Sequence, residues 1–252
     1  MSEAINQFLF GWYPYLCIAV FLLGSLIRFD REQYTWRSGS SQLLRRRQLA
    51  WGSNLFHVGI LIIFLGHFFG LLTPIAVFDF LGISHGAKQV LAIVVGGIAG
   101  IACFIGLTLL VHRRLFDARI RNNSSFGDIA VLLLLYVQLI LGLATISISL
   151  QHLDGEVMLK FMTWAQGIVT LQPGVASLVA DANPIFKLHL FLGMTIFLVF
   201  PFTRLVHIWS APVWYLGRRG YQVVRTRQLV GAYGSAHAIP PQRPGRPTVP
   251  AE

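Results

Sequence analysis

Four histidines lie inside strongly apolar stretches of the chain. His57 and His67 fall within NLFHVGILIIFLGHFFGLLTP, and His189 and His207 fall within a second stretch that crosses residue 200. Burying an ionisable ring in an apolar segment is costly and usually serves a function. One such histidine more often forms a hydrogen bond to a neighbouring helix. Four of them, restricted to two segments, favour ligation of a metal.

The composition places these segments in a membrane. The chain has 252 residues, of which 55% are hydrophobic and 12% are charged, and its mean hydropathy is +0.64. A soluble domain carries about 25% charged residues. The net charge of +10 comes from basic residues beside apolar spans, which orient a membrane protein, so we expect no nucleic-acid partner.

Five segments are long enough to cross a bilayer, which takes about 20 apolar residues. The predicted spans are Trp12–Phe29, Trp51–Leu72, Lys88–Val111, Asp128–Leu150 and Ile185–Trp209. All 17 arginines fall on one side of these spans and all three lysines on the other. The positive-inside rule then places the N-terminus outside and the C-terminus in the cytoplasm, as in a bacterial or archaeal-type cytoplasmic (inner) membrane.

Three further features complete the predicted organisation. The segment EVMLKFMTWAQGIVTL, Glu156–Leu171, is short and carries two charges, which favours an interfacial helix over a sixth span. Residues 1–216 form the membrane domain, and residues 217–252 form a basic, Pro-rich, partly disordered cytoplasmic tail. The chain has no CxxCH, so we expect no covalent c-type haem, and Cys17 and Cys103 are expected to pack as free thiols.

The four histidines form two pairs according to their predicted depth in the membrane. The second and fifth spans run in opposite directions, so His67 lies level with His189 near the outside and His57 lies level with His207 near the cytoplasm. An opposed histidine pair on two facing helices is typical of a b-type haem with no open coordination site, which suits electron transfer. The sequence therefore predicts an all-α integral membrane fold, a five-helix transmembrane bundle with two stacked b haems.

The spacing fits this arrangement only in part. His189 and His207 are 18 residues apart, about five helical turns, and share a face, whereas His57 and His67 are 10 apart and are about 80° out of phase. The two axial separations are about 27 Å and about 15 Å. Tilt and a kink at Pro201 would have to absorb the difference. Gly96 and Gly100, four residues apart, allow close approach of a helix or of a flat cofactor, and helix packing is favoured.

Several long motifs resemble the gamma subunit of respiratory nitrate reductase, over about Tyr13 to Tyr221. They are YTWRSGSSQLL, SNLFHVGILIIFLGHFFGLLTP, WAQGIVTL and KLHLFLGMTIFLVFPFTRLVHIWSAPVWYL. The resemblance implies a quinol-oxidising membrane cytochrome b that holds two b haems and releases protons outside. It also implies partners on the cytoplasmic side, an iron–sulfur beta subunit and a molybdenum-cofactor alpha subunit, and nitrate is reduced on the latter.

The resemblance also implies roles for individual residues. His67 and His189 would hold the outer haem, His57 and His207 the inner haem, and Lys88, Gly66 and His67 would form the quinol site. A lysine at a helix end is otherwise a common snorkelling anchor. Arg204 and Arg37 are possible partners of haem propionates, and each also suits an ordinary anchor at the inner face. The loop HRRLFDARIR, His112–Arg121, suits either a docking loop or a stop signal for insertion.

Two other functions remain open at this point. A related dihaem cytochrome b of a sulfite- or heterodisulfide-type quinone-linked reductase would have similar helices and another partner. A histidine-based membrane transporter for metal ions or protons would need acidic partners within the spans, and Asp128 lies only at a helix start. A cofactor-free anchor would gain nothing from four buried histidines.

Overall fold

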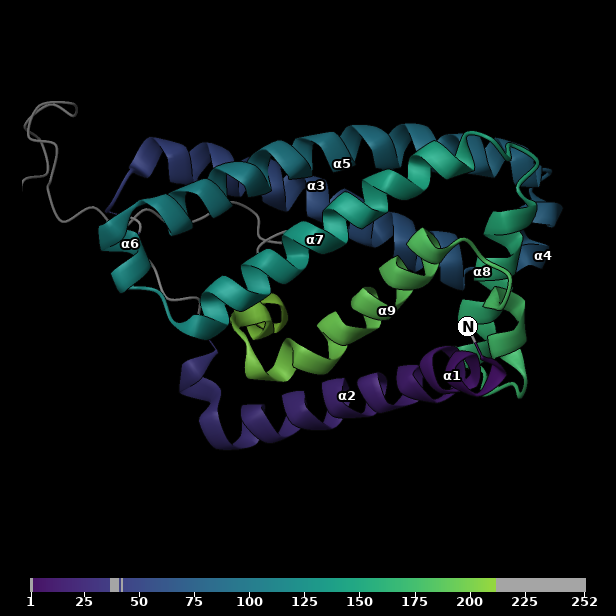
Figure 1. Ribbon diagram of the computed structural model, residues 1–252, viewed down its shortest axis with the longest axis horizontal. Helices are drawn as coiled ribbons and strands as arrows, with labels where there is room; N and C mark the ends of the chain where they lie inside the picture. The colour runs from purple at the N-terminus through teal and green to yellow at the C-terminus, as the bar shows by residue number, and fades with distance from the viewer. Residues whose placement is uncertain (1, 37–40, 42, 212–252) are drawn as a thin grey trace, which may run out of the picture. The chain divides into compact units, whose positions relative to one another are not determined.

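Five helical segments of the computed structural model are long and apolar enough to cross a membrane, as predicted (Figure 1). They are Glu3–Thr35, α3 (Arg46–Leu72), α5 (His85–Phe116), α7 (Phe126–Ser149) and Pro184–Phe202. The first comprises α1 (Glu3–Gln7), the π-helical turn η1 (Phe8–Trp12), α2 (Tyr13–Glu32) and η2 (Gln33–Thr35). The last comprises α9 (Pro184–Val199) and η4 (Phe200–Phe202). All regular elements in the described residues are helical.

The structure describes residues 2–36, 41 and 43–211. Shorter elements connect the spans: α4 (Ile75–Phe80), α6 (Ala118–Asn122), α8 (Glu156–Val169), η3 (Val175–Val179) and η5 (Arg204–Ser210). The segment predicted to lie at the membrane interface forms α8, a helix of 14 residues. The predicted tail, residues 217–252, and Arg37 both lie outside the described residues.

Side-chain caps fix where the long helices begin. Ser84 accepts the backbone N–H of Ala87 at the start of α5. Ser125 and Asp128 form a reciprocal capping box at the start of α7. Each cap satisfies backbone donors that a helix start leaves without a partner. These starts are therefore determined locally by the sequence.

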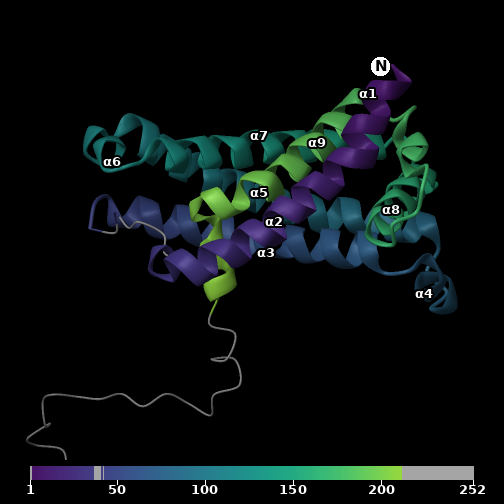
Figure 2. The ribbon, with the colours of Figure 1, turned by 90° about the horizontal axis from the view of Figure 1, so that it is seen from below.

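The helices pack in the order α3, α5, α7, α9, α2. Each helix in this series contacts the next, and the closest association is that of α3 with α5 (Figures 1 and 2). The two histidine-bearing helices, α3 and α9, are not among the closely packed pairs of the described residues. They are held by α5 on one side and by α7 and α2 on the other. The space between α3 and α9 is therefore set by their neighbours.

Glycines make the contact between α3 and α5 possible. A Cβ on Gly106 would lie 2.4 Å from the backbone nitrogen of Phe56, and one on Gly59 would lie 2.7 Å from the carbonyl oxygen of Ala99. Gly100, of the predicted glycine pair, faces Leu143 on α7 at 2.7 Å, which confirms its helix-packing role. Gly96 has nothing within 4 Å of its Cβ position. Only some of the glycines therefore allow close approach.

The predicted fifth helix, Ile185–Trp209, is interrupted at Pro201 and not only kinked there. α9 ends at Val199, η4 follows, and Thr203 is extended with φ −119° and ψ 177° before η5 begins. Pro201 lies in the break, where it has no N–H to donate and its ring obstructs a regular helix. His207 therefore lies on η5 and not on α9, and the helical spacing of five turns from His189 does not apply.

The N-terminal segment packs against α8 and η3 at one end of the bundle. The indole N–H of Trp164 on α8 donates to the carbonyl oxygen of Phe10 at 2.9 Å. Both residues belong to a buried cluster that includes Ile168, Ala176 and Val179. α4 lies at the same end, and α6 lies at the opposite end (Figures 1 and 2). The lysine-bearing end of the bundle thus has its own small core.

The Gly106 contact can be tested by adding a single methyl group. We expect Gly106→Ala to destabilise the protein by about 1–3 kcal/mol, because the new Cβ overpacks the interface between α3 and α5. Gly96→Ala on the same helix is the matched control, and its thermal midpoint in detergent should stay the same or rise slightly, since alanine is the better helix former. Equal midpoints for the two variants would contradict this account of the interface.

Candidate functional site

The imidazole rings of His67 on α3 and His189 on α9 lie close together. Their ring centroids lie 6.2 Å apart, and the ring planes are inclined at 46°. Two opposed imidazoles that bind one metal at about 2 Å per bond have their ring centres about 6 Å apart. The spacing of this pair is therefore suitable for a shared metal ion.

Three of the four histidines use the same ring nitrogen in the same way. In each, Nδ1 lies within hydrogen-bond distance of a backbone carbonyl oxygen in the preceding turn. The pairs are His57 with Ser53 at 2.7 Å, His67 with Ile63 at 2.9 Å, and His207 with Arg204 at 2.5 Å. A ring that donates from Nδ1 keeps the Nε2 lone pair free. Histidines that bind metals commonly make this contact, because it fixes the tautomer and the ring orientation.

His189 is held differently, by α7. The side-chain amide of Gln138 donates to the carbonyl oxygen of His189 at 3.1 Å, and the same amide nitrogen lies 3.5 Å from Nε2 of the ring. A Cβ on Gly142 would lie 3.0 Å from the ring. The buried Nδ1 of His189 has no hydrogen-bond partner among the described residues. Sequence reasoning missed Gln138, although a single amide in an apolar span was the available signal.

The inner histidines are not in contact. Within the described residues a ring contact joins His67 to His189, whereas none joins His57 to His207. His57 lies on α3, one helical turn after Ser53, and His207 lies on η5, beyond the break. The inner pair therefore depends on where η5 is held relative to α3.

The donor set suits a haem better than a site made of protein ligands alone. Among the described residues, no group of three or more His, Cys, Asp or Glu side chains is placed to hold a metal ion. Two imidazoles leave most coordination positions to another donor, as in a haem, where the porphyrin supplies the rest. Gly66 and Gly70, beside His67, have nothing within 4 Å of their Cβ positions. The α3 side of the outer histidine pair is thus open beside His67, as a flat macrocycle would require.

Lys88 lies beside the same turn of α3. Its ammonium donates to the carbonyl oxygen of Gly70 at 2.9 Å and lies 2.8 Å from the sulfur of Met162. It also lies 3.6 Å above the ring of Phe78. The residue is only 8% exposed, so the side chain is packed against α3. The structure therefore brings Lys88 close to the turn that carries Gly66 and His67.

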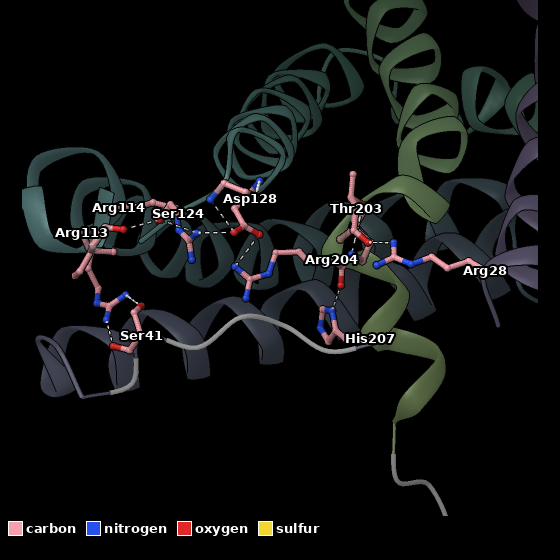
Figure 3. Close-up of polar contacts among 12 residues, drawn as sticks. Arg28, Ser41, Arg113, Arg114, Ser124, Asp128, Thr203, Arg204 and His207 are labelled. Atoms are coloured by element: carbon pink, nitrogen blue, oxygen red, sulfur yellow. Dashed lines mark hydrogen bonds and ion pairs between the residues drawn. The ribbon is translucent and has the colours of Figure 1, made fainter. Parts of the chain in front are cut away.

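The opposite end of the bundle contains a network of arginines (Figure 3). Asp128 lies between Arg114 and Arg204, with each N–O distance 3.5 Å. Arg113 is buried, and its guanidinium donates to the backbone oxygens of Ser41 and Leu44 at 2.7 Å each. The predicted propionate partner Arg204 thus already pairs with an acid. The basic run of α5 and α6, read from sequence as a loop, is largely helical.

Asp117 joins the start of α3 to this network. Its carboxylate accepts the backbone N–H groups of Ile120 and Arg119 and lies 2.7 Å from the guanidinium of Arg45. The hydrogen bond from Ile120, together with the charge of Arg45, holds the pKa of Asp117 below its usual range. The carboxylate therefore stays ionised at neutral pH.

Arg28 of α2 holds the break in the fifth segment (Figure 3). Its Nη1 donates to the carbonyl oxygens of Pro201 at 2.6 Å and Thr203 at 3.0 Å. Sequence reasoning counted Arg28 only among the arginines of the inner face. No local pattern could have identified this role, because the two partners are more than 170 residues away.

Known proteins resemble this chain over most of its length. The sequence model of the family described as "Nitrate reductase gamma subunit" matches residues 6–227. The chain is 51% identical over 226 residues to the respiratory nitrate reductase 1 gamma chain of Escherichia coli (strain K12), covering 89% of this chain and 99% of that protein. It is 40% identical over 222 residues to the nitrate reductase gamma chain of Bacillus subtilis (strain 168), covering 88% and 99%.

A third relative is longer. The chain is 34% identical over 230 residues to the nitrate reductase-like protein NarX of Mycobacterium tuberculosis (strain ATCC 25618 / H37Rv), covering 90% of this chain and 35% of that protein. The matches extend over both histidine-bearing segments and confirm the resemblance that the motifs indicated. By its five apolar helices and these matches, the chain belongs to the nitrate reductase gamma subunit family.

Proposed function

We propose that this chain is the membrane-anchoring cytochrome b subunit of a respiratory nitrate reductase, and that it carries electrons from quinol to partner subunits. The observation that carries the proposal is the opposed pair His67 and His189, 6.2 Å apart and beside the buried Lys88. The family match favours nitrate over sulfite or heterodisulfide as the final acceptor.

The four histidines would hold two b haems. His67 and His189 would hold the outer haem, and His57 and His207 the inner haem. Haem iron between two histidines supplies one-electron transfer and has no open coordination site. His57, His67 and His207 keep Nε2 free for this role by engaging Nδ1 with the backbone. Their ring orientations are thus set by the protein in advance of binding.

Lys88, Gly66 and His67 would form the quinol site. An ammonium has three donors; two of those of Lys88 are directed at Gly70 and Met162, and the ring of Phe78 lies on a further side, so a quinol oxygen would replace one of these contacts. Gly66 presents backbone without a side chain, so a flat ring can approach α3 closely. The ammonium would orient the quinol and take part in removal of its protons toward the lysine-bearing side.

The arginine-bearing end would face the cytoplasm and the partners. The positive-inside rule gives this orientation, with protons released outside and the iron–sulfur beta and molybdenum-cofactor alpha subunits bound at the inner face of a cytoplasmic membrane. Arg204 and Arg37 remain candidate propionate partners. Arg113 joins them, because its buried Nε has no hydrogen-bond partner among the described residues. Reduction of nitrate itself would take place on the alpha subunit.

Replacement of one ligand in each pair tests the haem assignment. We expect His189→Ala and His207→Ala each to remove about half of the haem absorbance, because each breaks one of two bis-histidine pairs. Potentiometric titration of the reduced-minus-oxidised spectrum should show that the two variants lose different components. His152→Ala, which changes an exposed histidine outside the spans, should keep both. Two intact components in either ligand variant would refute the assignment.

Replacement of Lys88 tests the quinol site. Lys88→Met removes a charged hydrogen bond worth about 1.5–3 kcal/mol, so quinol-dependent nitrate reduction should fall about 10- to 100-fold with both haems retained. Activity with a soluble reductant that bypasses this subunit should not change. Lys160→Met, which alters an exposed lysine on α8, is the control and should keep full quinol activity. Full quinol activity in Lys88→Met would exclude Lys88 from the site.

A further inference from the structure

The segment that carries His207 is separated from α9 by a break. α9 ends at Val199, and Thr203 is extended, so the backbone hydrogen bonds of a regular helix do not continue into η5. Pro201 also contributes no donor. The position of His207 is therefore not determined by α9, and contacts from other helices have to fix it.

Arg28 supplies the strongest of these contacts. One guanidinium nitrogen, Nη1, donates to the carbonyl oxygens of Pro201 and Thr203, at 2.6 and 3.0 Å. The rest of the group is held by Thr35, through Nε to the hydroxyl at 3.2 Å and Nη2 to the carbonyl at 3.3 Å. A charged donor makes stronger hydrogen bonds than a neutral one, and a planar fork held on both edges fixes direction as well as distance. Arg28 is thus hydrogen-bonded to Pro201 and Thr203, the residues on either side of the point where the chain changes direction.

The same face of α2 is shaped to fit the break. Gly24 lies one turn before Arg28, and a Cβ there would lie 2.8 Å from the ring of Pro201. Phe21 packs edge-on against Phe200, with ring centroids 4.8 Å apart, and stacks on Trp209 at 5.6 Å. α2 therefore contacts the chain before, within and after the break, and Arg28 provides the polar part of that contact.

A second tether comes from α7 and is weaker. Asp128 lies 3.5 Å from the guanidinium of Arg204, whose carbonyl oxygen accepts the hydrogen bond from His207. Both side chains of that ion pair are partly exposed, and Asp128 is shared with Arg114. Partly exposed ion pairs contribute little. The shorter hydrogen bonds of Arg28 are therefore the stronger polar contacts to the break, beside the apolar packing of Leu205 and Val206.

We propose that Arg28 is a positioning residue for His207. It acts through the carbonyls of Pro201 and Thr203 and holds η5 so that the imidazole of His207 is directed toward the inner haem that it would share with His57. The inference rests on the proposed function, in which His207 binds the inner haem. It adds that the inner ligand is positioned by α2, whereas the outer ligand His189 lies on α9 and is held by Gln138 of α7. The two haem sites would then respond separately to changes in α2.

The test uses the complete membrane-bound complex with Arg28→Gln and Arg28→Lys. Arg28→Gln should lose more than half of the inner haem, because an amide cannot reach both carbonyls and Thr35 at once. Arg28→Lys keeps the charge without the fork, so it should retain the inner haem with a shifted low-spin electron paramagnetic resonance signal and a shifted midpoint potential. The outer haem should be unchanged in both variants. Arg31→Gln, three residues further along α2 and exposed, is the control and should alter neither haem.

A second variant alters the contact of α2 with Pro201 without changing Arg28. Gly24→Ala leaves Arg28 in place and displaces Pro201, so it should shift the same inner-haem signal. An unchanged inner haem in Arg28→Gln would overturn the proposal. Equal loss of both haems would also overturn it, because Arg28 would then support the whole bundle. Fewer than two haems in the unsubstituted complex would instead refute the proposed function, which separates the two failures.

Discussion

The arrangement of this protein depends on one constraint, that an imidazole inside an apolar bundle needs a partner for each ring nitrogen. Three of the four histidines engage Nδ1 with a backbone carbonyl in the preceding turn, so Nε2 is the nitrogen that remains. Because α3 and α9 are not closely packed on each other, these nitrogens lie between helices that other helices hold apart. α5 and α7 act as the spacers, and the glycines between α3 and α5 allow that spacing.

Buried charged groups are stabilised by different contacts at the two ends of the bundle. At the lysine end, Lys88 has no carboxylate among its described contacts, which are a carbonyl, a thioether and an aromatic face. None of these contacts neutralises the positive charge of Lys88. The charge therefore remains able to attract an oxygen-bearing ligand. At the arginine end, guanidinium groups pair with Asp128 or donate to backbone carbonyls. In the contacts with carbonyl oxygens, the charged guanidinium groups fix the position of the backbone that they bind.

In the proposed arrangement of the haems, the break after α9 would resolve a mismatch in length. Ten residues separate the histidines of α3 and eighteen separate those of the fifth segment, so two continuous helices would place the second pair about 12 Å out of level. Ending α9 at Val199 and turning the chain through Thr203 removes the requirement for that straight rise. The turn needs outside support, and Arg28, from the first span, provides it.

The five spans could be predicted from the sequence because hydropathy is a local property, and the caps at the starts of α5 and α7 are local as well. The long motifs likewise indicated the family, which the comparisons confirmed. A kink at Pro201 was predicted, but the separate segment η5, the contact of Gln138 with His189 and the contacts of Arg28 with the break could not be predicted. Each joins residues about fifty or more positions apart or depends on how a proline is accommodated by another helix. Such contacts exist only once the helices have packed, so the tertiary structure alone decided them.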